Sequence, residues 1–127
     1  MARIMVIDDD PATLLAARAL LERLGHEVVT ADSGSEGVES AVADAPDMVL
    51  TDIFMPFQDG LETLRRLKRE VPGLPVVCMS AGPRQLAQPN ATRDAMLRFA
   101  RHFGADASLT KPLHPADLKA VLATVLA

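Results

Sequence analysis

The stretch that decides the fold is 49–60, VLTDIFMPFQDG, in the middle of the chain. Its apolar start, continuous with Met48, is typical of a strand that is buried on both faces of a sheet. Asp52 follows where such a strand ends, and Pro56 disfavours a helix at the residue before it. Ligands bind at the carboxyl ends of strands in open α/β sheets, so a carboxylate there indicates a functional site. The alternative is an aspartate that only caps the turn.

Composition predicts a globular domain with an aliphatic core. The 127 residues are 49% hydrophobic but only 3% aromatic, and the net charge is −4. This length suits one domain, 1–127, for which we expect no separate output domain. The acidic balance argues against direct nucleic-acid binding. A single cysteine, Cys78, and the lack of a long apolar segment predict a cytoplasmic protein that does not insert into membranes.

Strand and helix patterns alternate along the whole chain. This alternation predicts an α/β fold in three layers, a five-stranded parallel sheet with five helices on its two faces. For the strand order we adopt 2-1-3-4-5, the flavodoxin-like order known from other α/β folds, in which the first and third strands are neighbours. The expected strands are 3–7, 27–31, 47–51, 74–79 and 105–110, and the expected helices are 11–24, 33–45, 61–70, 93–103 and 115–126.

Apolar spacing predicts which side of each helix faces the core. In the second expected helix the inward residues would be Val38, Ala41, Val42 and Ala45. The third expected helix carries a basic run, which we interpret as a solvated face, with a docking surface as the less favoured alternative. This run consists of Arg65, Arg66, Lys68 and Arg69.

Polar residues without a structural explanation lie at the carboxyl ends of expected strands. Asp8 and Asp9 follow the first strand, whereas Asp10 is explained as the N-cap before Pro11. Adjacent carboxylates raise one another's proton affinity, and a hard cation with oxygen ligands is the natural compensation. The adopted topology brings one set of residues to the same edge of the sheet: Asp8, Asp9, Asp52, Ser80 and Lys111.

Two other kinds of site fit these residues less well. A flavodoxin-like cofactor site needs a phosphate-binding loop after the first strand, and the acidic segment 8–10 has the opposite charge. A phosphohydrolase with an aspartate nucleophile normally carries a second acid two residues further on. This chain has Phe54 at that position.

The complete set resembles the response-regulator receiver domain of two-component signalling, from Arg3 to the end of the chain. It comprises the acidic pair 8–9, the pattern D-x-x-M-P-x-x-D-G over 52–60, Ser80, and Lys111-Pro112. The resemblance implies that Asp52 accepts a phosphoryl group from a phosphohistidine of a sensor kinase or phosphotransfer protein. It also implies a signalling domain rather than a conventional enzyme, one that catalyses only its own phosphotransfer and a slow self-dephosphorylation.

The resemblance further implies a Mg²⁺ site in this acidic pocket. Asp9 and Asp52 would bind the ion directly, Asp8 mostly through metal-bound water, and Phe54 through its main-chain carbonyl. Opposite the metal, Lys111 would contact the phosphoryl oxygens.

Other features of the family carry over to the end of the site and to its output. The hydroxyl of Ser80 would follow the phosphoryl group, and the peptide bond between Lys111 and Pro112 would be cis. Signal would leave through protein contacts, on the face formed by the fourth helix, the fifth strand and the fifth helix.

Three features depart from the usual pattern of the family. Ser108 stands where an aromatic residue is usual, three residues before Lys111, and the segment 82–92 is longer than usual. These two departures predict that the activation change lies within 81–103 rather than in the fifth strand. The third departure is the apolar Phe54, at a position that influences the access of water. A degenerate receiver that acts only through protein binding is the alternative to a phosphoacceptor.

Overall fold

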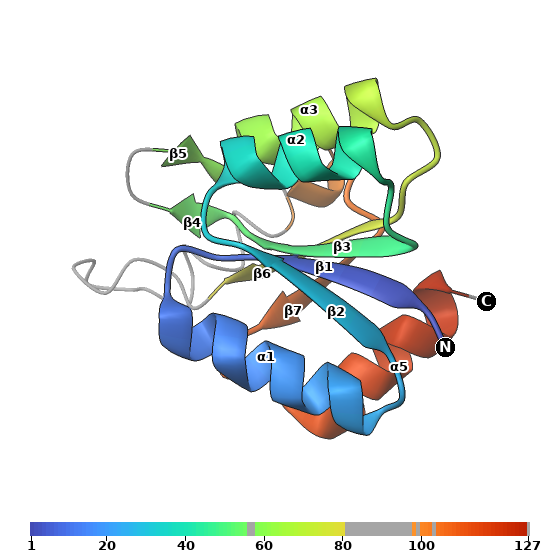
Figure 1. Cartoon of the computed structure of the whole chain (residues 1–127). Helices are drawn as coiled ribbons and strands as arrows, with labels where there is room; N and C mark the ends of the chain where they lie inside the picture. The colour runs from blue at the N-terminus through green and yellow to red at the C-terminus, as the bar shows by residue number, and fades with distance from the viewer. Residues whose placement is uncertain (56–57, 81–97, 99, 103, 127) are drawn as a thin grey trace, which may run out of the picture.

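The computed structural model describes residues 1–55, 58–80, 98, 100–102 and 104–126 (Figure 1). Arg98 and residues 100–102 are helical, within the fourth expected helix, and Ala100 is buried. The rest of that helix and the segment 82–92 lie outside the described residues. The elements are β1 (Arg3–Ile7), α1 (Pro11–Arg23), β2 (Glu27–Ala31), α2 (Gly34–Ala43), β3 (Met48–Asp52), β4 (Phe54–Met55), β5 (Gln58–Asp59), α3 (Gly60–Glu70), β6 (Val76–Ser80), β7 (Ala107–Thr110) and α5 (Pro115–Val125).

Five strands form one parallel sheet in the order β2-β1-β3-β6-β7. Counted along the chain without the short pair β4–β5, this is the predicted order 2-1-3-4-5, and the flavodoxin-like fold class is confirmed. α1 and α5 cover one face of the sheet, and α2 and α3 cover the other (Figure 1). Ile7 lies opposite Thr51, so the residues after β1 and at the end of β3 meet at one edge.

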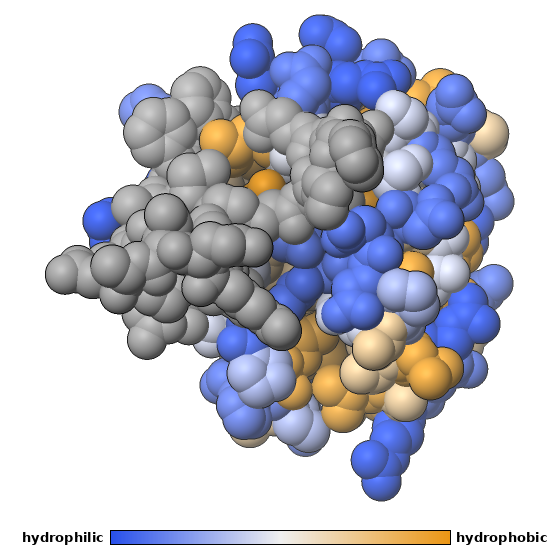
Figure 2. Space-filling view, turned by 90° about the vertical axis from the view of Figure 1, so that its left-hand side faces the viewer, coloured by the Kyte–Doolittle hydropathy of each residue, from blue (hydrophilic) through white to orange (hydrophobic). Residues whose placement is uncertain are grey.

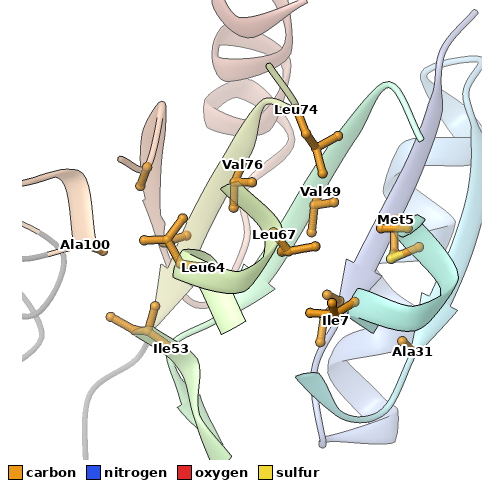
Figure 3. Packing of buried hydrophobic residues seen from close by; sticks show 14 residues of the cluster. Met5, Ile7, Ala31, Val49, Ile53, Leu64, Leu67, Leu74, Val76 and Ala100 are labelled. Atoms are coloured by element: carbon orange, nitrogen blue, oxygen red, sulfur yellow. The ribbon is translucent and has the colours of Figure 1, made fainter. Parts of the chain in front are cut away.

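Apolar clusters fill the space on both faces of the sheet. On one face, Leu64 and Leu67 of α3 pack towards Val49 and Val76 (Figure 3). The opposite face packs α1 and α5 against alternate residues of the same strands. A sheet buried on both faces explains why its central strands are continuously apolar. Each described helix is too short or too polar to cross a lipid bilayer.

The second helix is shorter than predicted. Its N-cap is Ser33, as expected, but it ends at Ala43, because Asp44 has an extended backbone with φ −153° and ψ 91°. Ala45 precedes a proline, and a residue before proline disfavours the helical region. Ala45 is therefore outside the helix and exposed, and Val42 is 53% exposed, so the prediction that both face the core is wrong.

The basic run of α3 is not one solvated face. Arg65 and Arg69 are exposed as predicted, but Lys68 is half-buried. Its Nζ lies 2.6 Å from Asp106 Oδ2 and donates to the carbonyl oxygen of Leu74 at 2.8 Å. The prediction of a solvated side chain is therefore wrong for Lys68. Its partner Asp106 is distant in sequence, so no local pattern indicates the ion pair.

Candidate functional site

Three aspartates converge at the carboxyl edge of the sheet. Asp8 and Asp9 follow β1, and Asp52 is the last residue of β3, inside the strand rather than after it. One carboxylate oxygen from each of the three lies within 4.8 Å of the other two. The strand order and register thus bring together the three acids that the sequence analysis selected.

The main chain holds the Asp8 side chain in place. Asp8 is fully buried, and its Oδ1 accepts a hydrogen bond from the Asp10 N–H at 2.9 Å. Asp10 in turn caps α1, accepting from the Ala12 N–H at 3.1 Å. The start of α1 therefore fixes the carboxylate of Asp8, and Asp10 serves the structural role that was predicted for it.

Lys111 is the cation of this cluster. It follows β7, and its Nζ lies 2.5 Å from Asp8 Oδ2 and 2.9 Å from Asp52 Oδ2. Burial lowers the pKa of Lys111, but the charge of Asp52 and the hydrogen bonds to both aspartates outweigh burial and raise it. The Lys111 N–H donates to the carbonyl oxygen of Ser80, and the bond between Lys111 and Pro112 is cis, as the resemblance implied.

The charges of the cluster do not balance. Burial, a hydrogen bond with Asp8 and the charge of Asp8 raise the pKa of Asp9, because its carboxylate lies beside another anion. Among the described residues, three carboxylates against one ammonium leave two negative charges, which one divalent cation would neutralise. Oxygen donors of this kind suit Mg²⁺, and the residues therefore fit the ion that the resemblance implies.

Ser80 and Phe54 complete the predicted set. Ser80 is the last residue of β6 and is fully buried. Since Asp52 pairs with Met79 in the neighbouring strand, Ser80 lies at the same edge of the sheet. Phe54 begins the short strand β4, whose antiparallel pairing with β5 the sequence analysis did not predict.

Ser108 lies inside β7, opposite Cys78 of β6, and is half-buried. A small hydroxyl, not an aromatic ring, thus stands at this position of β7. Most of the segment 81–103, in which the activation change is predicted, lies outside the described residues.

An apolar hollow beside Lys111 was missed by the sequence analysis. It has a volume of about 230 Å³ and lies between α1 and the chain after β7. Figure 2 views this end of the sheet and shows apolar residues gathered in its lower part. No local sequence pattern predicts the hollow, because it is formed by two segments that are far apart in sequence. Besides Lys111, its lining residues are Ala12, Thr13, Ala16, Leu20, Pro112 and Leu113.

Comparisons with known sequences agree with this geometry. The family model described as the response regulator receiver domain matches residues 4–123. Protein PilH from Pseudomonas aeruginosa is 33% identical over 129 residues, which cover all of this chain and 99% of that protein. The regulatory protein PhoP from Bacillus subtilis is 28% identical, and the chain spans only 48% of its length. The chain thus spans nearly all of one relative and about half of another.

Solved structures are similar over almost the entire chain. The receiver domain of NtrX from Brucella abortus has a TM-score of 0.84 at 28% identity, covering 97% of both chains. The chemotaxis protein CheY4 from Vibrio cholerae has a TM-score of 0.83 at 23% identity, covering 99% of both chains. The latter likeness concerns the fold alone.

Proposed function

The chain belongs to the response-regulator receiver domain family, and from this premise we propose that it is a phosphorylation-dependent signalling domain with Asp52 as its phosphoacceptor. Receiver domains of this family are signalling phosphoacceptors that work with histidine kinases or phosphotransfer proteins. The donor here would be a phosphohistidine of such a partner. Residues 1–127 would act as one domain, and its signal would leave through altered protein contacts.

The observation that carries this proposal is the unbalanced cluster of Asp8, Asp9 and Asp52 around Lys111. In the reaction, a carboxylate oxygen of Asp52 forms a bond to phosphorus while the bond between phosphorus and the histidine nitrogen breaks. The electron pair of the broken bond stays on the imidazole. Phosphoryl transfer depends mainly on positioning and charge neutralisation. Lys111, already 2.9 Å from Asp52, supplies a positive charge at the attacking group.

The same residues support a Mg²⁺ site. Asp9 and Asp52 would bind the ion directly, Asp8 through water, and Phe54 through its main-chain carbonyl. When bound, the ion offsets negative charge on the phosphoryl oxygens. The hydroxyl of Ser80, at the end of the adjacent strand, would interact with the phosphoryl group once it is on Asp52.

Two further features bear on the proposed partners and on the lifetime of the phosphoryl group on Asp52. A protein donor needs a surface beside the reacting atoms, and the apolar hollow next to Lys111 supports docking there. The downstream target would bind the face of the fourth helix, β7 and α5. Because the apolar side chain of Phe54 cannot hydrogen-bond a water molecule, slow loss of the phosphoryl group is expected.

The proposal is tested with a small phosphodonor, acetyl phosphate, with and without Mg²⁺. Intact mass should show one phosphoryl group on the wild type only when Mg²⁺ is present, and none on Asp52→Asn. Asp117→Asn, which changes an exposed aspartate of α5 in the same way, should be labelled like the wild type. Equal labelling of Asp52→Asn would remove Asp52 as the phosphoacceptor.

A further inference from the structure

The peptide unit directly after Asp52 is held at both ends. The hydroxyl of Thr51 donates to the carbonyl oxygen of Asp52 at 3.2 Å, and the N–H of Ile53 donates to the carbonyl oxygen of Met79 at 3.2 Å. Thr51 is fully buried and Ile53 is 3% exposed. Water therefore does not compete for these hydrogen bonds, and the peptide unit is fixed between β3 and β6.

Gly60 lies against the same segment from the other side. A Cβ atom at Gly60 would be 2.3 Å from the Cα of Ile53 and 2.6 Å from its carbonyl carbon and oxygen. The neighbour is main chain, which cannot rotate away as a side chain can. Among the described glycines, positive φ occurs at other positions, so the conformation of Gly60 is open to alanine. Close approach to Ile53, not a turn, explains glycine here.

The short hairpin connects these two contacts. β4 pairs with β5 so that Phe54 lies opposite Asp59, and the chain then returns to Gly60 at the start of α3. The segment from Asp52 to Phe54 is thus held by Thr51 where it begins and by Gly60 where the hairpin closes. This segment carries two of the groups assigned to the Mg²⁺ site, the carboxylate of Asp52 and the carbonyl of Phe54.

We propose that Thr51 and Gly60 are positioning residues that fix the main chain from Asp52 to Phe54 and thereby set the affinity of the Mg²⁺ site. The proposal rests on the function proposed above, because it assumes that Mg²⁺ binds there. Thr51 acts through a hydrogen bond to the Asp52 carbonyl oxygen, and Gly60 acts by letting α3 contact the main chain of Ile53. Residues that orient ligands usually change metal affinity when they are replaced.

Gly37 provides a matched control for Gly60. Both are buried glycines in helices of the same layer, so replacement by alanine changes helix propensity in the same direction. A Cβ at Gly37 would also be too close to a neighbour, at 2.3 Å from Cδ1 and 2.8 Å from Cγ1 of Ile7, but both of these are side-chain atoms. The contact at Gly37 is therefore with a side chain, whereas the contact at Gly60 is with main chain.

The experiment measures the dissociation constant of Mg²⁺ by isothermal titration calorimetry on the folded wild type, Gly60→Ala and Gly37→Ala. Gly60→Ala should weaken binding by about tenfold or more, the usual size for a residue that orients a metal ligand. Gly37→Ala should remain near the wild-type value. Wild-type affinity in folded Gly60→Ala would overturn the role of Gly60.

A second pair of variants decides the matter if Gly60→Ala does not fold. Thr51→Val keeps the shape of the side chain but removes the donor, whereas Thr51→Ser keeps the hydroxyl. We expect weaker Mg²⁺ binding in Thr51→Val and near-wild-type binding in Thr51→Ser. Equal affinities in the two variants would overturn the proposal. If the wild type itself does not bind Mg²⁺, the proposed function fails at its metal site, and this result is distinct from a wild type that binds and variants that bind equally well.

Discussion

Two lysines at opposite edges of one sheet show how similar ion pairs serve different purposes. At the amino edge, Lys68 pairs with Asp106, and the same Asp106 oxygen accepts the N–H of Val76 at 2.8 Å. At the carboxyl edge, Lys111 pairs with both Asp8 and Asp52. The first arrangement has one charge of each sign. The second has an excess of carboxylates, since Asp9 lies beside it.

The difference extends to burial. The side chain of Asp106 is 42% exposed, whereas that of Asp8 is fully buried. The pair of Lys68 and Asp106 is balanced in charge and partly hydrated, and it links α3 to the starts of β6 and β7. A buried cluster with excess negative charge has lost hydration without full compensation, so it gains when a cation binds. Charge balance, rather than the presence of an ion pair, thus distinguishes Lys68 from Lys111, the lysine for which we propose a functional role.

The largest expected effect comes from replacing each lysine with methionine. Lys111→Met removes the ammonium group from two buried carboxylates, those of Asp8 and Asp52, and should lower the free energy of unfolding by about 3 kcal/mol. Lys68→Met removes a partly exposed pair and should cost about 1 kcal/mol. Urea denaturation followed by circular dichroism in the presence of EDTA measures both values. The exposed Lys119→Met serves as the control and should change little.

Mg²⁺ makes the same comparison sharper. Ligands that bind only the folded state stabilise it, so added Mg²⁺ should restore part of the loss in Lys111→Met. Mg²⁺ should stabilise Lys68→Met only as much as it stabilises the wild type, because the ion pair of Lys68 lies at the other edge. Equal costs for the two lysines, with equal responses to Mg²⁺, would contradict the distinction drawn between them.

The strands were predictable from sequence because each is a short apolar run, whereas their order was adopted from the flavodoxin-like fold. The ends of the strands were not predictable, because main-chain hydrogen bonds form between strands whatever the polarity of the side chains. Asp52 pairs with Met79, and Ser80 pairs with Thr110, so both polar site residues are part of their strands. The strands expected from hydropathy ended one residue earlier, at 51 and 79. The expected strand at 74–79 also began too early, since β6 starts only after Pro75.

The residues of the site were predictable as a set, but their surroundings were not. Asp8, Asp9 and Asp52 could be selected because polar residues at strand ends lack a structural explanation. The contact of Gly60 with Ile53 and the pair of Lys68 with Asp106 depend on how distant segments pack, which no local pattern reports. The chemical roles of the site residues remain predictions that the variants above test.

A smaller effect is expected at Cys78, which lies between the two edges in β6. Burial and the charge of Asp52 raise the pKa of the Cys78 thiol to about 12, while Lys68 lowers it and Asp106 raises it. In the unfolded chain the thiol ionises at its ordinary pKa, near 8.5. Above that pH the folded state binds more protons than the unfolded state, so the free energy of unfolding falls as pH rises.

This loss should approach about 1.4 kcal/mol per pH unit until the folded thiol itself ionises. It is measured by urea denaturation at about pH 8 and about pH 10, where the ordinary thiol titrates. The chain contains no tyrosine, so tyrosine ionisation does not interfere. Cys78→Ala should have a shallower slope, whatever its absolute stability. Asp52→Asn should lower the pKa of the Cys78 thiol in the folded protein, which is measured from the absorbance of the thiolate as pH rises. An unchanged pKa would show that the charge of Asp52 does not act on Cys78.

The smallest expected effect is a gain in stability when Asp9 is replaced by asparagine. Burial, the hydrogen bond with Asp8 and the charge of Asp8 raise the pKa of Asp9. The folded state therefore binds this proton more tightly than the unfolded state, and stability falls as pH rises through the window above the ordinary value. At neutral pH without metal, Asp9→Asn should be more stable by about 0.5 kcal/mol, a size suited to an exposed group.

Thermal unfolding with EDTA measures this gain, which should vanish below about pH 4, where the ordinary aspartate is protonated. With Mg²⁺ the order should reverse, because the wild type keeps the carboxylate that is proposed to bind the ion and would be stabilised more strongly. Asp106→Asn is the matched variant at the other edge. It breaks a balanced pair, so it should be less stable than the wild type with or without Mg²⁺. If Asp9→Asn also loses stability in EDTA, the carboxyl edge does not carry the excess negative charge on which the comparison of the two lysines depends.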